Sequence, residues 1–246
     1  MFESMFRRRI LDNSLGKKSR IVLAFDEYGE SNSVLERLNW VCEHLGEHLA
    51  CIKIGYPTIL STGLSELRKI IFRFRDENLF MADVKMADVA HTNSLIARIL
   101  YETGFDAVIS HGFIGYKGGL EGVFKEAKEL NRGVVIVVSM SHIGSTEFID
   151  PNMEKLVQIA LKHHADGAVA PATRTQVVKR VREIVGNKLL IFTPGVGAQG
   201  ADYGSGISAG ADFEIIGRSI MCSSNPVEAV LEVKKKHDRI LSCRAC

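Results

Sequence analysis

Three charged side chains lie within six residues of one another at the end of an apolar segment. Asp83, Lys85 and Asp88 follow the stretch 78–82, which is apolar after its first residue. On a β-strand, residues two apart point to the same side, so Asp83 and Lys85 are expected to face the same way. Two acids around one lysine would hold that lysine protonated. A strand ending near Lys85 and a helix beginning near His91 would leave Asp88 in the connecting loop.

Two interpretations of this cluster remain open at this point. Acid–base pairs near strand ends are often solvated surface structure that contributes little to stability. Here the charges end a largely apolar segment, so they are expected to be partly desolvated. The carboxyl end of a strand is also where alternating strand–helix proteins place their chemistry.

Eight apolar runs, each followed by a helix or a helical turn, account for most of the chain. Most are continuous rather than alternating, which is typical of strands buried on both faces. The expected strands are residues 21–25, 50–56, 79–85, 107–113, 133–140, 167–173, 188–193 and 213–217. The expected helices and turns are residues 31–45, 61–76, 92–103, 118–130, 151–164, 175–185 and 203–209, with a last helix from Pro226.

Eight βα units in 246 residues predict an α/β fold of the TIM (β/α)8 barrel type. We expect one barrel domain over residues 1–246, with an N-terminal arm at about 1–19 and a C-terminal tail at about 237–246. An open doubly wound sheet is the structural alternative, but no GxGxxG pattern follows the first strand.

Composition narrows the possible partners. The chain is 46% hydrophobic and 24% charged, and its formal net charge of +2 is too small to indicate nucleic acid or an anionic membrane surface as a partner. No apolar run approaches the roughly 18 residues that a membrane span needs. The basic start of the chain has no apolar region behind it, so we expect no secretory signal.

The five cysteines indicate a reducing compartment. Their count is odd, and Cys42, Cys51 and Cys222 lie in apolar elements, which favours free thiols in a cytoplasmic protein. Cys243 and Cys246 have CxxC spacing, but no second pair accompanies them. We interpret this pair as part of a frayed terminus rather than a redox or metal site.

In a barrel, the carboxyl ends of all strands form one rim, which collects the polar residues that interrupt or follow the apolar runs. Unpaired buried charge is costly, so a shared site would let the charges compensate one another. The rim residues are Asp26, Lys53, Asp83, Lys85, His111, 139–141, Thr173, the loop 194–200 and 217–219, with Asp88 beside them.

Two rim segments indicate phosphate binding. The glycine-rich loop 194–200 follows the seventh expected strand, and Gly217 and Arg218 follow the eighth. Glycine lets backbone N–H groups approach an anion closely, and a guanidinium can donate two parallel hydrogen bonds to phosphate oxygens. TIM barrels often bind substrate phosphate at these two loops. The histidines show neither H-x-H nor HExxH spacing, so we expect no metal site.

Over roughly residues 20–235 the chain resembles the orotidine 5′-phosphate decarboxylases of the shorter microbial and archaeal type. The most specific match is Asp83-Val-Lys-Met-Ala-Asp88, the DxKxxD motif of that family. Related sugar-phosphate enzymes share this motif, so five further stretches in the same order make the match specific. They are Leu23-Ala-Phe-Asp26, Lys53-Ile-Gly-Tyr-Pro57, Met140-Ser-His-Ile-Gly144, Pro194-Gly-Val-Gly-Ala-Gln-Gly200 and Gly217-Arg-Ser-Ile220.

The resemblance implies decarboxylation of orotidine 5′-monophosphate to uridine 5′-monophosphate, the last step of de novo pyrimidine synthesis. It implies no cofactor and no metal, and a homodimer with two active sites at its interface. Nucleic acid and membrane are not expected as partners.

Residue roles follow from the resemblance by position. Lys53, Asp83, Lys85 and Asp88 would form an alternating charge network in which Lys85 protonates the C6 carbanion. Asp88, Val89 and Thr92 would come from the neighbouring subunit. The remaining substrate contacts would be Asp26 and Lys53 to the ribose, Ser141 and Pro194 at the pyrimidine, Gln199 between base and phosphate, and Gly217 and Arg218 at the phosphate.

Some positions depart from the family's usual residues. Ile143 stands where a proline is frequent, and Val89 replaces a common isoleucine, which is a mild apolar change. The segment from Gln199 to Tyr203 is a candidate lid that would close over bound nucleotide.

Three alternatives are kept. The first is a magnesium-dependent sugar-phosphate decarboxylase or synthase that shares DxKxxD, although Ser141 and Gln199 suit a pyrimidine better. The second is a catalytically silent nucleotide-binding barrel, against which the four network charges argue. A nucleic-acid-binding barrel has little support from the net charge or from the aromatic content of 7%.

Overall fold

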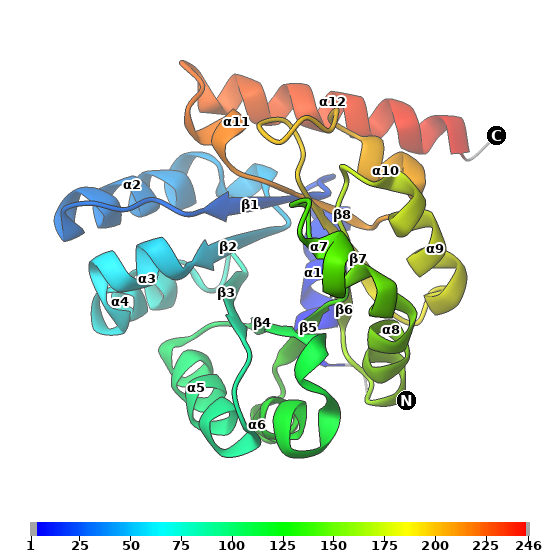
Figure 1. Cartoon of the computed structure of the whole chain (residues 1–246). Helices are drawn as coiled ribbons and strands as arrows, with labels where there is room; N and C mark the ends of the chain where they lie inside the picture. The colour runs from blue at the N-terminus through cyan, green and yellow to red at the C-terminus, as the bar shows by residue number, and fades with distance from the viewer. Residues whose placement is uncertain (1–3, 245–246) are drawn as a thin grey trace.

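The computed structural model describes residues 4–244. Within this range, eight parallel strands close into a barrel in chain order, with β8 pairing back onto β1 (Figure 1). The strands are β1 Ile21–Phe25, β2 Cys51–Gly55, β3 Phe80–Met86, β4 Ala107–His111, β5 Gly133–Val137, β6 Gly167–Val169, β7 Leu190–Pro194 and β8 Phe213–Ile216. The predicted TIM (β/α)8 barrel is therefore confirmed.

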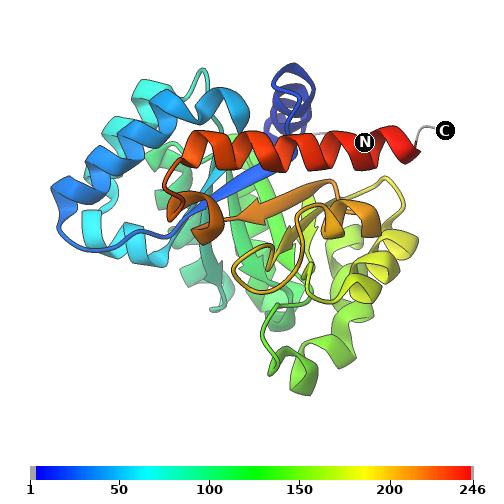
Figure 2. The same ribbon diagram turned by 90° about the horizontal axis from the view of Figure 1, so that it is seen from above.

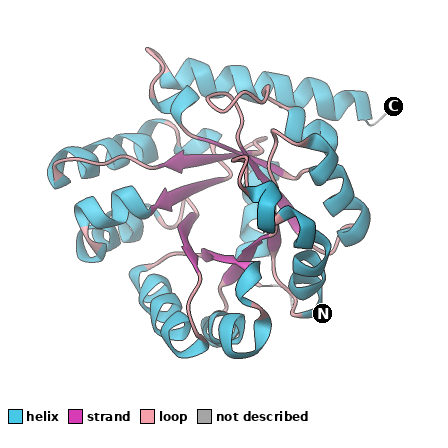
Figure 3. Cartoon of the chain, viewed as in Figure 1, coloured by secondary structure: helices cyan, strands magenta, loops and turns pink. Residues whose placement is uncertain are grey.

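Helices cover the outside of this barrel, and the C-terminal helix runs along one side of it (Figures 2 and 3). They are α1 Met5–Gly16, α2 Ser31–His44, α3 Tyr56–Thr62, α4 Leu64–Phe74, α5 Ala90–Thr103, α6 Glu121–Leu130, α7 Ser145–Phe148, α8 Met153–Lys162, α9 Thr175–Val185, α10 Ser205–Ala209, α11 Arg218–Met221 and α12 Pro226–Arg244. Short helical turns lie at Gly46–His48, Gly112–Ile114, Tyr116–Leu120 and Asp150–Asn152. Across residues 4–244, no helix combines the length and apolar character that a bilayer span requires.

The apolar residues form two cores, one on each face of the barrel sheet. In β1, Ile21 and Leu23 pack outward against the surrounding helices, whereas Val22 packs into the barrel interior with residues such as Phe192 and Phe213. Because both faces of the barrel sheet are buried, the strands are apolar at nearly every position, which explains the continuous apolar runs in the sequence.

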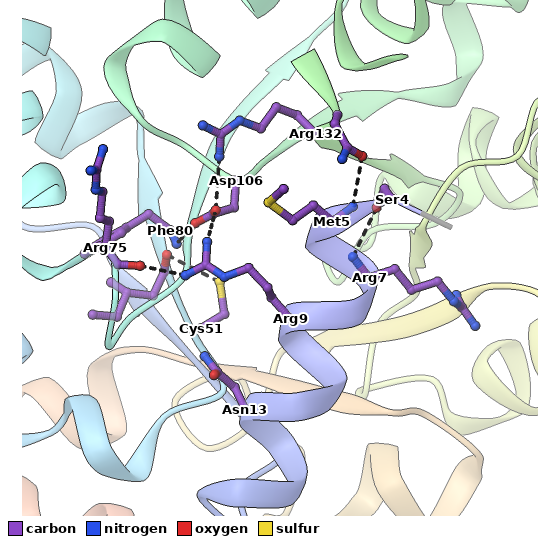
Figure 4. Close-up of polar contacts among 12 residues, drawn as sticks. Ser4, Met5, Arg7, Arg9, Asn13, Cys51, Arg75, Phe80, Asp106 and Arg132 are labelled. Atoms are coloured by element: carbon purple, nitrogen blue, oxygen red, sulfur yellow. Dashed lines mark hydrogen bonds and ion pairs between the residues drawn. The ribbon is translucent and has the colours of Figure 1, made fainter. Parts of the chain in front are cut away.

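Helix α1 closes the amino end of the barrel. Phe6 and Ile10 are buried in the interior core, so the helix fills this end of the barrel. Arg9 donates to Asp106 at 2.7 Å, and the other carboxylate oxygen of Asp106 accepts from the backbone N–H of Phe80 at 2.9 Å (Figure 4). These contacts leave the opposite, carboxyl end of the strands as the open face.

Several element boundaries differ from those expected. The helix expected over 61–76 is two helices, because Gly63 adopts φ 75° between α3 and α4. The fifth and sixth strands end at Val137 and Val169, earlier than expected. Residues 237–244, expected as a tail, continue helix α12, while Cys246 lies outside the described residues.

Candidate active site

A chain of alternating charges lies at the carboxyl ends of the first three strands. Lys53 Nζ in β2 is 3.1 Å from Asp26 Oδ1 after β1, and 3.0 Å from Asp83 Oδ2 in β3. Lys85 Nζ is 2.9 Å from Asp83 Oδ1. The carboxylate of Asp83 therefore lies between two ammonium groups. Gly55 makes room for this contact, because a Cβ there would lie 1.8 Å from Asp26 Oδ1.

The contact between Lys85 and Asp83 depends on an irregularity in β3. Ala82 pairs with Val108 and Met86 with Ser110, so three residues of β3 lie opposite a single residue of β4. Within this bulge, Lys85 adopts φ 42°, a left-handed conformation that costs a non-glycine residue about 1–2 kcal/mol. Strained backbone of this kind is concentrated at functional sites, where the surrounding structure holds it in place.

The charged groups of Lys53 and Asp83 stabilise each other in their ionised forms. Burial acts to lower the pKa of Lys53, but the carboxylates of Asp83 and Asp26 outweigh it and raise that pKa above its usual value. Burial acts to raise the pKa of Asp83, but Lys53 and Lys85 outweigh it and lower that pKa. Lys53 and Asp83 are consequently ionised at neutral pH, even though both are almost completely buried.

The network forms part of the wall of a cavity of about 340 Å³ at the open end of the barrel. Nine of the residues expected to contact a ligand line it: Asp26, Lys53, Asp83, Lys85, Ser141, Pro194, Gln199, Gly217 and Arg218. The barrel fold therefore brings together residues that lie up to 192 positions apart in the sequence, counted from Asp26 to Arg218.

One side of the cavity is a compact polar corner around Gly195. A Cβ at this position would lie 3.0 Å from Thr173 Cγ2, 3.4 Å from Ser141 Cβ and 3.5 Å from Gln199 Oε1. Gly195 also has φ 99°, so both its backbone angle and the space around it favour glycine. The side chains of Ser141 and Gln199 thus converge from the loops after β5 and β7.

The far side of the cavity is cationic. Arg218 is exposed at the end of β8, next to Gly217. Among residues 4–244, no group forms a hydrogen bond or ion pair with the guanidinium of Arg218. A guanidinium without a protein partner can donate two parallel hydrogen bonds to an incoming anion.

Three of the expected site residues lie away from this cavity. The carboxylate of Asp88 accepts from the backbone N–H of Val89 at 2.6 Å and is not among the ion pairs of the charge network. Asp88 and Val89 line a separate hollow beside Gly118 and Gly119, and Thr92 is half-buried on α5. Within one chain, the charge network therefore consists of Asp26, Lys53, Asp83 and Lys85.

Sequence reasoning missed the residues that support the loop after β5. Asp150 Oδ1 accepts from Ser139 Oγ at 2.6 Å and from Ser145 Oγ at 2.7 Å, while Arg174 lies 3.0 Å from its other oxygen. Arg174 also donates to the carbonyl of Met140, the residue before Ser141. The position of Arg174 directly after Thr173 at the rim was the one available signal.

His111 also lies beside the network. Burial lowers its pKa to about 4, with a smaller contribution from the charge of Lys85. The imidazole is therefore neutral at physiological pH and adds no third positive charge next to Asp83. Among the described residues, no group of three or more His, Cys, Asp or Glu side chains is arranged to hold a metal ion.

Comparisons with known proteins place this geometry in a family. Residues 19–233 match the sequence model of the orotidine 5′-phosphate decarboxylase / HUMPS family. A Methanosarcina barkeri protein named orotidine 5′-phosphate decarboxylase is 40% identical over 217 residues, which cover 88% of this chain and 94% of that protein. A Pyrococcus abyssi protein of the same name is 40% identical over 213 residues, covering 87% of this chain and 96% of its own.

The fold agrees with that assignment. The crystal structure of orotidine 5′-monophosphate decarboxylase from Methanocaldococcus jannaschii, complexed with the inhibitor BMP, superposes with a TM-score of 0.79 at 34% identity. The superposition covers 88% of this chain and 97% of that one. With a matching sequence, the same barrel and a DxKxxD lysine inside its charge network, the chain belongs to the orotidine 5′-phosphate decarboxylase / HUMPS family.

Proposed function

We propose that this protein is a carboxy-lyase that converts orotidine 5′-monophosphate to uridine 5′-monophosphate in pyrimidine biosynthesis. The observation that carries the proposal is the position of Lys85. Its ammonium group is fixed 2.9 Å from Asp83 at the wall of a cavity that has a pyrimidine-compatible polar corner and a free guanidinium. Membership of the family supplies the substrate class.

The cavity offers a matching group for each part of the nucleotide. Arg218 and the backbone of Gly217 bind the phosphate, and Asp26 with Lys53 holds the ribose hydroxyls. Ser141 donates to the pyrimidine while Pro194 packs near it. Gln199 bridges base and phosphate, since its Oε1 lies at the corner around Gly195 and its side chain lines the same cavity as Arg218.

Lys85 then stabilises the charge that the reaction creates. The bond between C6 and the carboxylate breaks, CO2 leaves, and the electron pair stays on C6. An ammonium already held beside C6 stabilises this carbanion without reorganising, which is the main source of electrostatic catalysis. A proton then passes from Lys85 Nζ to C6 and yields the product. The carboxylate of Asp83 faces that of the substrate, and their repulsion is relieved as CO2 departs.

The active enzyme in this proposal is a homodimer with shared sites. Asp88 does not join the network of its own chain, and its hydrogen bond to Val89 keeps it at the surface. Val89, directly before α5, and Leu95 and Ile99, one turn apart on that helix, are exposed, with exposed fractions of 61%, 51% and 51%. Pairing of two such faces would cover this apolar surface and bring Asp88, Val89 and Thr92 to the partner's cavity, with Asp88 extending the charge network.

The reaction in this proposal needs neither cofactor nor metal, since Lys85 supplies both the charge and the proton. We place the protein in the cytoplasm, with its cysteines as free thiols. Cys42, Cys51, Cys222 and Cys243 are unpaired within the described residues.

The test follows the absorbance of orotidine 5′-monophosphate mixed with purified protein, with and without a chelator. Turnover to uridine 5′-monophosphate that resists the chelator is the expected result. Turnover that the chelator abolishes would favour a magnesium-dependent relative. Nucleotide binding without turnover would identify a catalytically silent barrel instead.

A further inference from the structure

A fully buried carboxylate lies outside the cavity, behind the loop that carries Gln199. Glu214 in β8 has no exposed surface, and its side chain points away from the barrel interior toward α10 and α12. Glu214 Oε2 accepts from the backbone N–H of Gly204 at 2.9 Å and from His237 Nε2 at 2.8 Å. Its Oε1 accepts from the backbone N–H of Gly206 at 2.9 Å. The buried carboxylate of Glu214 is therefore satisfied by three hydrogen-bond donors.

The two glycines that Glu214 holds are sterically required. Gly204 has φ 88°, and a Cβ there would lie 2.2 Å from Ile240 of α12. A Cβ at Gly206 would lie 2.3 Å from Thr193 Oγ1 in β7. The backbone at 204–206 is therefore packed directly against β7, β8 and α12, which leaves no room for a side chain at either glycine.

Gly204 is the C-terminal end of the loop that follows β7, residues 195–204, which we call the phosphate-side loop. The loop leaves β7 at Pro194, and its middle is held by contacts within itself. Gly197 N–H donates to Ala201 at 2.7 Å, and Gly200 N–H donates to Gly197 at 2.9 Å. The residues that project from it, including Gln199, are exposed. The loop thus extends from two anchors, one at Pro194 and the other at Gly204.

The second anchor is joined to the C-terminal helix. His237 is 2% exposed on α12, and α12 lies beside β8 and α10 in both views of the molecule (Figures 1 and 2). Lys236 of the same helix lies over the ring of Tyr203, with its Nζ 5.0 Å from the ring centroid. The helix therefore contacts the loop end at two consecutive positions.

Resting on the proposed function, we propose that Glu214 and His237 are positioning residues for the phosphate-side loop. They hold its C-terminal end so that Gln199 is presented to the substrate phosphate. Binding energy from a part of the substrate remote from the reacting atom supports catalysis only if the groups that collect it are correctly placed. The Glu214–His237 pair touches neither substrate nor cavity and acts through the loop.

The experiment compares two substrates in four variants. Orotidine 5′-monophosphate contacts the phosphate-side loop through both its phosphate and its base, whereas orotidine, which lacks the phosphate, keeps only the contact of Gln199 with the base. E214Q keeps the shape of the side chain but cannot accept from both glycine N–H groups, and H237L removes the donor. H237Q keeps an Nε2 donor. E126Q is the matched control, because Glu126 is also a buried glutamate, bonded to Ser94 and Arg98 on the far helices.

We expect kcat/KM for orotidine 5′-monophosphate to fall at least about tenfold in E214Q and H237L, the effect of one lost charge-assisted hydrogen bond. The value for orotidine should fall by less than about threefold, since that substrate lacks the phosphate contact and loses at most part of the contact of Gln199 with the base. H237Q should lie near the wild type, and E126Q should change both substrates alike or not at all.

The proposal would be overturned if E214Q and H237L lowered kcat/KM equally for both substrates, or for neither. It would also be overturned if E126Q lowered kcat/KM for orotidine 5′-monophosphate selectively. If E214Q fails to fold, H237L and H237Q decide the question. Failure of the wild type to act on orotidine 5′-monophosphate would refute the proposed function instead. The anchor is then judged by amide hydrogen exchange of residues 196–206, which should be faster in H237L than in the wild type and E126Q; unchanged exchange would refute it.

Discussion

Lys85 Nζ donates to Asp83 Oδ1 at 2.9 Å, although the two residues are only two positions apart in one strand. In a regular strand, side chains at this spacing stand side by side rather than turning toward each other. The bulge opposite β4 and the left-handed backbone of Lys85 make the contact possible. The ammonium is thereby held before any substrate arrives, which is the condition for electrostatic stabilisation without reorganisation.

Removing this ammonium should abolish the chemistry more than the binding. We expect K85A to lower kcat by at least about a thousandfold, because both the charge next to C6 and its proton are lost. Turnover is measured by absorbance, and binding of uridine 5′-monophosphate by calorimetry. K69A, which alters a lysine on the exposed surface of α4, serves as the control and should leave kcat unchanged. Intact turnover in K85A would refute the assignment of the proton donor.

Shared sites can be tested by mixing two inactive proteins. K85A lacks the proton donor of its own chain, and D88N lacks the carboxylate that we assign to the partner's site. After subunit exchange, each mixed dimer would contain one site with both residues intact. Random mixing should therefore restore about a quarter of wild-type activity, since half of the dimers are mixed and each has one working site. No recovery after confirmed exchange would show that Asp88 serves its own chain.

Arg218 should matter only for substrates that carry the phosphate. R218A is expected to lower kcat/KM for orotidine 5′-monophosphate by roughly a hundredfold, because two charge-assisted hydrogen bonds are lost. R218K keeps the charge without the paired donors and should lie between R218A and the wild type. Activity on orotidine provides the internal reference. A parallel loss on orotidine would place Arg218 somewhere other than at the phosphate.

Asp166 at the amino end of the barrel should make stability depend on pH. Burial raises its pKa from 3.8 to about 6, against the opposing effect of its hydrogen bonds to Ser4 and Val134. Between these values the folded state keeps a proton that the unfolded state loses, so the free energy of unfolding falls as pH rises. The expected fall is on the order of 3 kcal/mol from pH 4 to pH 7.

D166N is the matched variant for this pH effect, because its side chain cannot titrate. Denaturant unfolding of the wild type and D166N at several pH values between 4 and 7 isolates the contribution of Asp166. As pH rises across this range, the free energy of unfolding of D166N should increase relative to that of the wild type. A difference that is independent of pH would contradict the raised pKa.

Helix α1 should contribute to stability without contributing to catalysis. Phe6 is buried at the amino end of the barrel, so F6A should lower the free energy of unfolding by about 3–5 kcal/mol. Leu15 on the same helix is 74% exposed, and L15A should change stability by less than about 0.5 kcal/mol. Both variants should keep the wild-type kcat at temperatures where they stay folded. A selective loss of kcat in F6A would show that the two ends of the barrel are coupled.

Much of this arrangement could be predicted because its causes are local in the sequence. Strands buried on both faces must be apolar throughout, so the barrel is visible as eight such runs. A charge that ends an apolar run, as Asp26 and Asp83 do, has to lie at the rim. Once the strands are parallel, their carboxyl ends meet at the same face, and Lys53 is brought to both acids.

The sequence alone determined the strand order, the end of the barrel that is open and the residue types at its rim. Only the tertiary structure decided how those side chains meet. The left-handed turn at Lys85 depends on the pairing of β3 with β4, and the outward position of Asp88 on its hydrogen bond to Val89. The contact between Glu214 and His237 joins residues from two elements across a buried layer. Such contacts depend on packing between segments distant in the chain, and no local pattern of residues encodes them.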